Sequence, residues 1–252
     1  MFGFKPKVPV APVDDLARDW IEISMARLVT MFSEDTLRKV RVFLPTPKDF
    51  PDQWQNPDEC AELLLCRVCG YMNVDRSTLE LEVFHDDEDE RRYALRHLNE
   101  TRSGAAGVYV PGDKSRKTTI IIKVSRTTPA DSIISTFAHE LCHVMLLGGS
   151  KVERDESDME LLTDLATIFF GFGIFTANSA IRFAQYSNGG GYGWSTRRQG
   201  YMPQEMIGYS LALFADRRQE SRPTWTKYLN VDVLTYFKKS AHFLTYHQIK
   251  DK

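Results

Sequence analysis

His139, Glu140 and His143 are the residues whose types and spacing most clearly suggest chemistry. They occur in the order His-Glu-x-x-His. Residues four apart lie on one face of a helix, so the two imidazoles can reach one metal ion, and the carboxylate of Glu140 can lie beside a water molecule bound to that ion. This pattern predicts a zinc site at which Glu140 acts as the general base of a hydrolysis.

The segments around this motif are suited to positioning it. Residues 117–125 are rich in β-branched side chains and predict a strand, and Pro129 opens a segment whose apolar residues recur at helical spacing. Gly148 and Gly149 predict the end of this helix, and a polar connection leads from there to a second, acidic helix. We therefore expect the order strand, metal-binding helix, turn, acidic helix.

The third metal ligand is expected to be a carboxylate of the second helix. Gly149 occupies the position at which metzincin proteases have a third histidine, which excludes that class. Glu156, Glu160 and Asp164 follow each other at intervals of four and share one face of a helix, so one of them can complete the site. The segment from Ser157 to Glu160 also fits a capping box, in which Glu160 would instead bind its own helix terminus.

The spacing of Glu160-Leu-Leu-Thr-Asp164 resembles the Glu-x-x-x-Asp element of the gluzincin metallopeptidases. In that family the Glu binds zinc and the Asp hydrogen-bonds a zinc-bound histidine. The resemblance therefore implies that Glu160 is the third ligand and that Asp164 orients a histidine from behind the metal ligands. It covers about residues 118–176. It implies a zincin-like α+β fold and a protein that hydrolyses peptide bonds.

Length, composition and charge narrow the class of protein. The 252 residues are 42% hydrophobic and 26% charged, which is enough to bury a full core. The formal net charge is −2 and the basic residues form short, separated groups, so no nucleic-acid partner is expected. The N-terminus lacks the apolar run of a secretory signal, and the longest apolar stretch, residues 165–175, is too short to span a bilayer. We expect a cytoplasmic protein that acts on a protein or peptide substrate, without a membrane partner.

The periodicity predicts one zincin-like α+β domain over residues 1–252, with a small mixed β-sheet. Its parts would be an N-terminal α/β part (1–105), a zinc-binding core (106–186) and a helical C-terminal lobe (187–252). Helices are expected over residues 15–32, 57–72, 203–217 and 231–246, in addition to the two metal-binding helices, and strands over residues 40–44, 79–84, 107–110 and 118–124.

The cysteines are expected to be buried thiols and not zinc ligands. Cys66 and Cys69 form one Cys-x-x-Cys pair with Cys60 nearby, but a zinc knuckle needs a second such pair, which the sequence lacks. Cys142 lies inside the histidine motif, where the helical period turns it away from the histidines.

Two polar segments are expected to lie outside the chemistry. The acidic run of residues 85–90 lacks the ligand spacing of a calcium loop and predicts a solvated turn. The glycine-rich segment of residues 187–194 lacks the Gly-Lys-Ser/Thr of a phosphate loop, so it is either a linker or a lid beside the active site.

The donor that stabilises the oxyanion of a peptide hydrolysis is expected from the C-terminal part, where Tyr201, Tyr209 and His242 are unranked candidates. The alternative to an enzyme is a non-catalytic interaction or regulatory module in which zinc is structural, and the presence of Glu140 argues against it. A nucleic-acid-associated regulator with a degenerate protease domain is disfavoured by the net charge.

Overall fold

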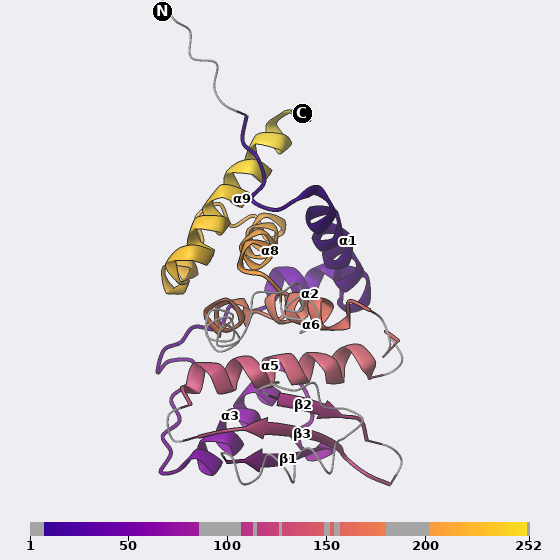
Figure 1. Ribbon diagram of the computed structural model, residues 1–252, viewed down its shortest axis with the longest axis vertical. Coiled ribbons are helices and arrows are strands. Elements are labelled where there is room, and N and C mark those ends of the chain that lie inside the picture. Colours follow the sequence, from indigo (N-terminus) through magenta and orange to yellow (C-terminus); the bar gives the residue numbers. More distant parts are fainter. Residues whose placement is uncertain are drawn as a thin grey trace, which may run out of the picture.

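The computed structural model (Figure 1) describes residues 8–85, 107–112, 115–125, 128–148, 152–153, 157–179 and 202–250. The described part of the chain has an α+β architecture. Its helices are α1 (Asp15–Phe32), α2 (Glu34–Lys39), α3 (Pro57–Met72), α5 (Ala130–Leu147), α6 (Met159–Phe169), α8 (Gln204–Arg217) and α9 (Val231–Lys250), with 3-10 turns at Arg76–Thr78 and Thr224–Tyr228. Its strands are β1 (Leu79–Phe84), β2 (Gly107–Val110) and β3 (Thr118–Lys123).

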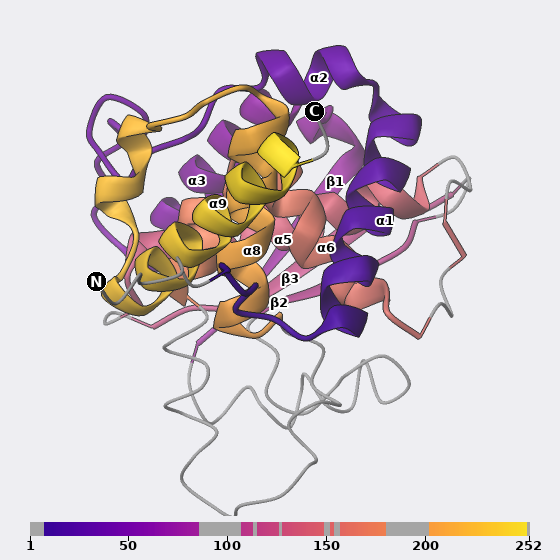
Figure 2. The ribbon, with the colours of Figure 1, turned by 90° about the horizontal axis from the view of Figure 1, so that it is seen from above.

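The elements are stacked so that α5 lies inside the molecule. In Figure 1 the sheet forms the lowest layer, α5 crosses over it, α6 lies above α5, and α1, α8 and α9 form the top. Seen from above, α8 and α9 cover this stack and α1 runs along its side (Figure 2). Helix α3 packs against α5 and β1. The His-Glu-x-x-His motif is therefore carried by a helix that is covered by the sheet on one side and by α6 on the other.

The three strands form a mixed sheet with the order β1-β3-β2. β1 is parallel to β3 and β2 is antiparallel to it, with Gly107 opposite Ile122 and Tyr109 opposite Ile120. Side chains alternate between the faces of a sheet, so Gly107 and Tyr109 share the face of Ile120 and Ile122, which belong to the main core. A second, smaller cluster on the opposite face contains Val108, Val110 and Ile121.

The ends of the helices follow from local sequence signals. The side chain of Asp14 accepts from the Ala17 amide at the start of α1, and Asn56 caps α3 in the same way ahead of Pro57. Helix α3 ends at Asn73 in the left-handed conformation, and α5 ends at Gly148. The expected helices over residues 15–32, 57–72, 203–217 and 231–246 and the strands over 79–84, 107–110 and 118–124 are confirmed, within a few residues at the ends.

The strand expected over residues 40–44 is wrong. The Phe43 amide donates to the carbonyl of Gly171 and the Leu44 amide to the carboxylate of Asp49, so this segment pairs with a turn and a side chain and not with a strand. Gly171 has φ +85, and a Cβ there would lie 2.0 Å from the carbonyl oxygen of Arg41. Glycine is therefore required where this segment crosses the turn after α6.

Three of the four cysteines are buried free thiols, as expected: Cys60, Cys69 and Cys142. The expectation is wrong for Cys66, which is exposed and lies one helical turn after Glu62, whose carboxylate is 3.4 Å from its sulfur. The helical period places these two residues on the solvent side of α3. The glycine-rich segment and residues 86–90 of the acidic run lie outside the described residues. In the described part of the chain, no helix has the length and apolar character needed to cross a membrane.

Asp52 and Arg67 attach the segment before α3 to that helix. Asp52 accepts from Arg67 Nη2 at 2.7 Å and also from Arg67 Nε, a bidentate contact. The hydrogen bonds to Arg67 hold the pKa of Asp52 below its ordinary value. A carboxyl group whose pKa is lowered by folding stabilises the protein above its unfolded pKa, and this contribution is lost as the pH falls through the folded pKa.

We therefore predict that Asp52→Asn lowers the melting temperature at pH 7 by roughly 2–4 °C, because losing a partly exposed pair costs about 1 kcal/mol. Thermal denaturation should show this difference shrinking as the pH falls below about 4. A difference that is constant between pH 7 and pH 3 would show that the ion pair is not its cause.

Candidate metal centre

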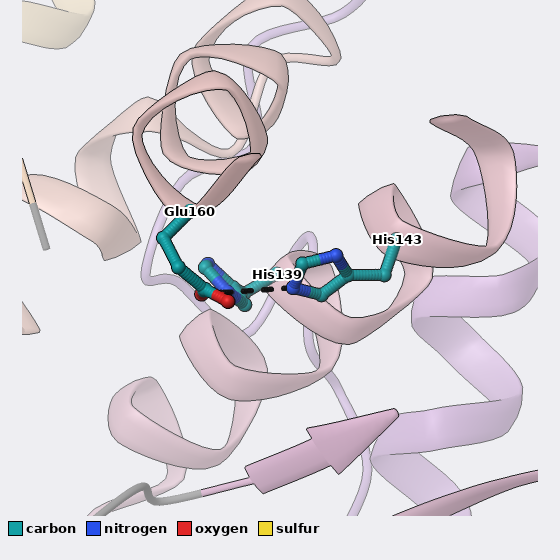
Figure 3. A group of neighbouring side chains, drawn as sticks. All are labelled: His139, His143 and Glu160. Carbon is teal, nitrogen blue, oxygen red and sulfur yellow. Dashed lines mark hydrogen bonds and ion pairs between the residues drawn. The ribbon is translucent and has the colours of Figure 1, made fainter. Parts of the chain in front are cut away.

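Two helices supply the side chains of the candidate metal centre. His139 and His143 lie one turn apart on α5, and Glu160 lies in the first turn of α6 (Figure 3). Glu160 Oε2 is 3.1 Å from His139 Nε2 and 3.7 Å from His143 Nε2. One ligand atom from each of the three residues lies within 4.8 Å of the other two, and no second group of this kind occurs among the described residues.

The two separations from Glu160 are close to those of ligands that share one metal ion. Two ligand atoms bound at about 2.0–2.1 Å to a tetrahedral ion lie about 3.4 Å apart. The two distances from Glu160 Oε2, 3.1 and 3.7 Å, bracket this value. Histidine nitrogens and a carboxylate oxygen are also suitable donors for a divalent transition metal. The three residues therefore form a group that could hold one metal ion.

Asp164 contacts the far side of His139. Its Oδ1 lies 2.9 Å from His139 Nδ1, and its Oδ2 accepts from the Met202 amide at 2.8 Å. Because Asp164 engages Nδ1, the Nε2 atom of His139 is the one directed toward Glu160. This is the contact that the Glu-x-x-x-Asp spacing implied, and Asp164 is buried, with 4% of its surface exposed.

Thr163 makes the corresponding contact with His143, and this contact was not predicted from the sequence. Its hydroxyl lies 3.4 Å from His143 Nδ1 and donates to the carbonyl of Met159 at 2.7 Å. Because the hydroxyl proton is used in that bond, the oxygen is left to accept from Nδ1–H, which directs Nε2 of His143 toward Glu160. Thr163 directly precedes Asp164, within the Glu-x-x-x-Asp element. This position was the only feature of the sequence that could have indicated its contact with His143.

The position of Glu160 depends on how α6 begins. Asp158 is the N-cap residue of α6 and its side chain makes no capping bond to the helix. It instead accepts from Trp20 Nε1 at 2.6 Å, which ties the start of α6 to α1. The capping box expected as an alternative, from Ser157 to Glu160, is therefore wrong: Glu160 reaches across to the histidines of α5.

Glu140 lies between α5 and the strand β2. It is 5% exposed, and the backbone amide of Tyr109 hydrogen-bonds its carboxylate. The ring of Tyr109 stacks on His143, with a centroid distance of 5.9 Å and an interplanar angle of 22°. Burial raises the pKa of Glu140, while the neighbouring histidines and the Tyr109 amide oppose this effect. The candidate general base is thus a buried carboxylate whose hydrogen-bond donor is the Tyr109 amide.

The electrostatics of the centre favour positive charge between two carboxylates. Burial disfavours protonation of His139, but hydrogen bonds to Asp164 and Glu160 outweigh it and raise the pKa of His139 well above its ordinary value. Burial also opposes ionisation of Glu160, yet hydrogen bonds to His139 and His143 lower its pKa. Buried carboxylates need a compensating cation. An imidazolium or a divalent metal ion can meet that need here.

The remaining expected site residues lie elsewhere. The hydroxyl of Tyr209 donates to Glu22 of α1 at 2.5 Å, and His242 is exposed on α9, which lies beyond α6 and α8 from α5 (Figure 1). The structure thus gives neither residue a place beside the histidines, which corrects their candidacy as oxyanion donors. Glu156 and Tyr201 lie outside the described residues.

Comparison with known proteins yields no relative from which a function could be transferred. No family model matches the chain, and neither a curated protein nor a solved structure matches it. The interpretation of the site therefore depends on its geometry.

We predict that Asp164→Asn weakens metal binding without abolishing it. The substitution keeps the shape of the side chain but removes the charge that orients His139, and loss of such a partner typically costs about 10- to 100-fold in affinity. Titration with Zn²⁺ against a chromophoric chelator would measure the change. Asp52→Asn is the matched control, since it removes a carboxylate that is paired with Arg67 of α3 and is not one of the residues of the centre. If Asp164→Ala abolishes binding while Glu160→Ala retains it, the two roles must be exchanged.

Proposed function

We propose that this protein is a zinc-dependent metallopeptidase of gluzincin type with a zincin-like fold. The observation that carries the proposal is the convergence of His139, His143 and Glu160, next to the buried carboxylate of Glu140. Metal ligands alone are compatible with a structural ion. Burying an acidic residue beside them costs free energy, so a functional reason for it is expected. A general base for hydrolysis is such a reason.

The ligand set favours a catalytic over a structural ion. Structural zinc sites usually have four protein ligands, often cysteines, whereas catalytic sites have three and keep one position for water or substrate. Of the described residues, two histidines and one glutamate meet here, and Cys142 lies on α5 but is fully buried within the core. Zinc also fits the two nitrogen donors better than magnesium or calcium, which prefer oxygen ligands.

The residues of the centre would have three roles in the hydrolysis: binding the metal ion, orienting its ligands and transferring a proton. His139, His143 and Glu160 would hold Zn²⁺, which when bound acidifies a water molecule and polarises the carbonyl of the substrate. Asp164 and Thr163 fix the rings of the two histidines by their hydrogen bonds to Nδ1. Glu140 would accept a proton from the attacking water on its carboxylate and later deliver that proton to the leaving amine.

A peptide substrate is supported by the position of β2. This strand pairs with β3 on one side and is the outermost of the described strands on the other. Because the Tyr109 amide faces Glu140, it points away from β3, and the alternation of an antiparallel pair directs the Tyr109 carbonyl and the polar groups of Gly107 the same way. An extended peptide that lay along this edge would be beside the general base.

A non-catalytic module with a structural metal ion remains the alternative. The ion-pair network between α5 and α6 would in that case serve only to join the helices, and Glu140 would have no chemical task. The two functions predict different consequences for a change confined to the Glu140 carboxylate, because this group is not one of the three ligands and would act only on a water molecule bound to the ion. The cytoplasmic location stays a prediction from the sequence.

We predict that Glu140→Gln lowers peptide hydrolysis by about 100-fold or more while zinc content and thermal stability stay near those of the wild type. The substitution keeps size and hydrogen-bonding capacity and removes only the base. A proteome-derived peptide library, analysed by mass spectrometry after incubation with each protein, would supply cleavage products. Glu80→Gln, on the exposed part of β1, is the matched control.

Cleavage that is equal in the wild type and in Glu140→Gln would contradict the catalytic role. If, in addition, His139→Ala abolishes a cellular phenotype that Glu140→Gln leaves intact, the metal is structural and the non-catalytic module is the better description.

A further inference from the structure

Strand β2 approaches α5 so closely at Gly107 that a side chain has no space there. A Cβ atom at this position would lie 2.4 Å from Thr136 Cγ2 and 2.8 Å from Glu140 Oε1, and both residues belong to α5. Real Cβ contacts are essentially never shorter than 3.0 Å. The backbone of Gly107 does not need a positive φ, so the requirement for glycine is one of space.

Tyr109, which follows Gly107 by two residues on β2, contacts both Glu140 and His143. Its backbone amide hydrogen-bonds the Glu140 carboxylate and its ring stacks on His143. Gly107 and Tyr109 lie on the same face of the sheet, because side chains alternate along a strand. One side of Glu140 is therefore limited by the backbone at Gly107, while the Tyr109 amide supplies a hydrogen-bond donor for its carboxylate.

We propose that Gly107 and Tyr109 are positioning residues that fix the carboxylate of Glu140. Gly107 lets β2 come close enough to α5 for the Tyr109 amide to reach this carboxylate, and a larger residue at position 107 would displace it. The inference rests on the proposed function for its catalytic consequence, but the displacement of Glu140 can be observed without any substrate.

The positioning role differs from a purely structural one in what a second substitution can restore. Thr136→Ser removes the methyl group nearest to a Cβ at position 107 and keeps the hydroxyl, which donates to the carbonyl of Ser132 at 3.0 Å. In the double variant Gly107→Ala/Thr136→Ser, the remaining close contacts are both with the Glu140 side chain, at Oε1 (2.8 Å) and Cγ (3.2 Å), and a rotation of this side chain relieves them. Stability should then recover while the carboxylate stays displaced.

The test uses the full chain in five forms: wild type, Gly107→Ala, the double variant, Glu140→Gln and Gly70→Ala. Gly70 is the matched control, because a Cβ there meets no atom within 4 Å and the position lies in α3. Thermal denaturation reports stability. Protein labelled with ¹⁵N at its ten tyrosines reports the Tyr109 amide, whose resonance is assigned by its disappearance in Tyr109→Phe.

We expect Gly107→Ala to lower the melting temperature and the double variant to recover most of the loss. The Tyr109 amide proton should shift upfield in Glu140→Gln, because the charged acceptor is lost, and shift in the same direction in Gly107→Ala and in the double variant. Gly70→Ala should leave it unchanged. Peptide hydrolysis should fall at least tenfold in the double variant at unchanged zinc content, because an error of about 1 Å in a catalytic group can cost about 100-fold.

The proposal is overturned if the double variant keeps the wild-type Tyr109 resonance, if it recovers hydrolysis together with stability, or if it fails to fold. It is also overturned if Glu140→Gln does not move the Tyr109 amide. Failure of the proposed function has a different signature: hydrolysis is then insensitive to Glu140→Gln, while the Tyr109 resonance still responds to the substitutions at positions 107 and 140.

Discussion

The contact between His139 and Asp164 is the interaction on which the centre depends. It joins the enclosed helix α5 to α6, and through the second oxygen of Asp164 it reaches the Met202 amide, just before α8. His139, Asp164 and Met202 are all buried. The loss of one member would leave a buried polar group unsatisfied, which typically costs about 1–3 kcal/mol or more when the group is charged.

The placement of α5 makes its polar residues informative. Helix α5 lies between the sheet and α6, and residues such as Phe137, Leu141 and Leu146 are fully buried there. Histidines and a glutamate in such a helix are unfavourable unless charges balance around them. The carboxylates of α6, the amide of Tyr109 and a divalent cation together would provide that balance, so one arrangement accounts for both the stability and the proposed chemistry of the centre.

Much of the fold and the centre of the site could be predicted because their signals are local. The four-residue spacing of His139 and His143, the glycine after α5 and the caps of α1 and α3 act within a few residues of the chain. Two features could not be predicted because they depend on contacts between separate segments. They are the absence of a strand over residues 40–44 and the contacts of Tyr109. Tyr109 meets Glu140 through a strand and a helix that lie far apart in the sequence, and no periodicity encodes such an approach. The exposure of Cys66 could have been predicted, because the helical period of α3 places this residue on the solvent side.

The central claim is that His139, His143 and Glu160 bind one zinc ion. X-ray diffraction data collected on both sides of the zinc absorption edge, from protein purified without a chelator, test it most directly. The account predicts a single anomalous peak at about 2.0–2.2 Å from His139 Nε2, His143 Nε2 and a carboxylate oxygen of Glu160. A centre without a peak after crystals are soaked in Zn²⁺, or a peak bound by other residues, would contradict it.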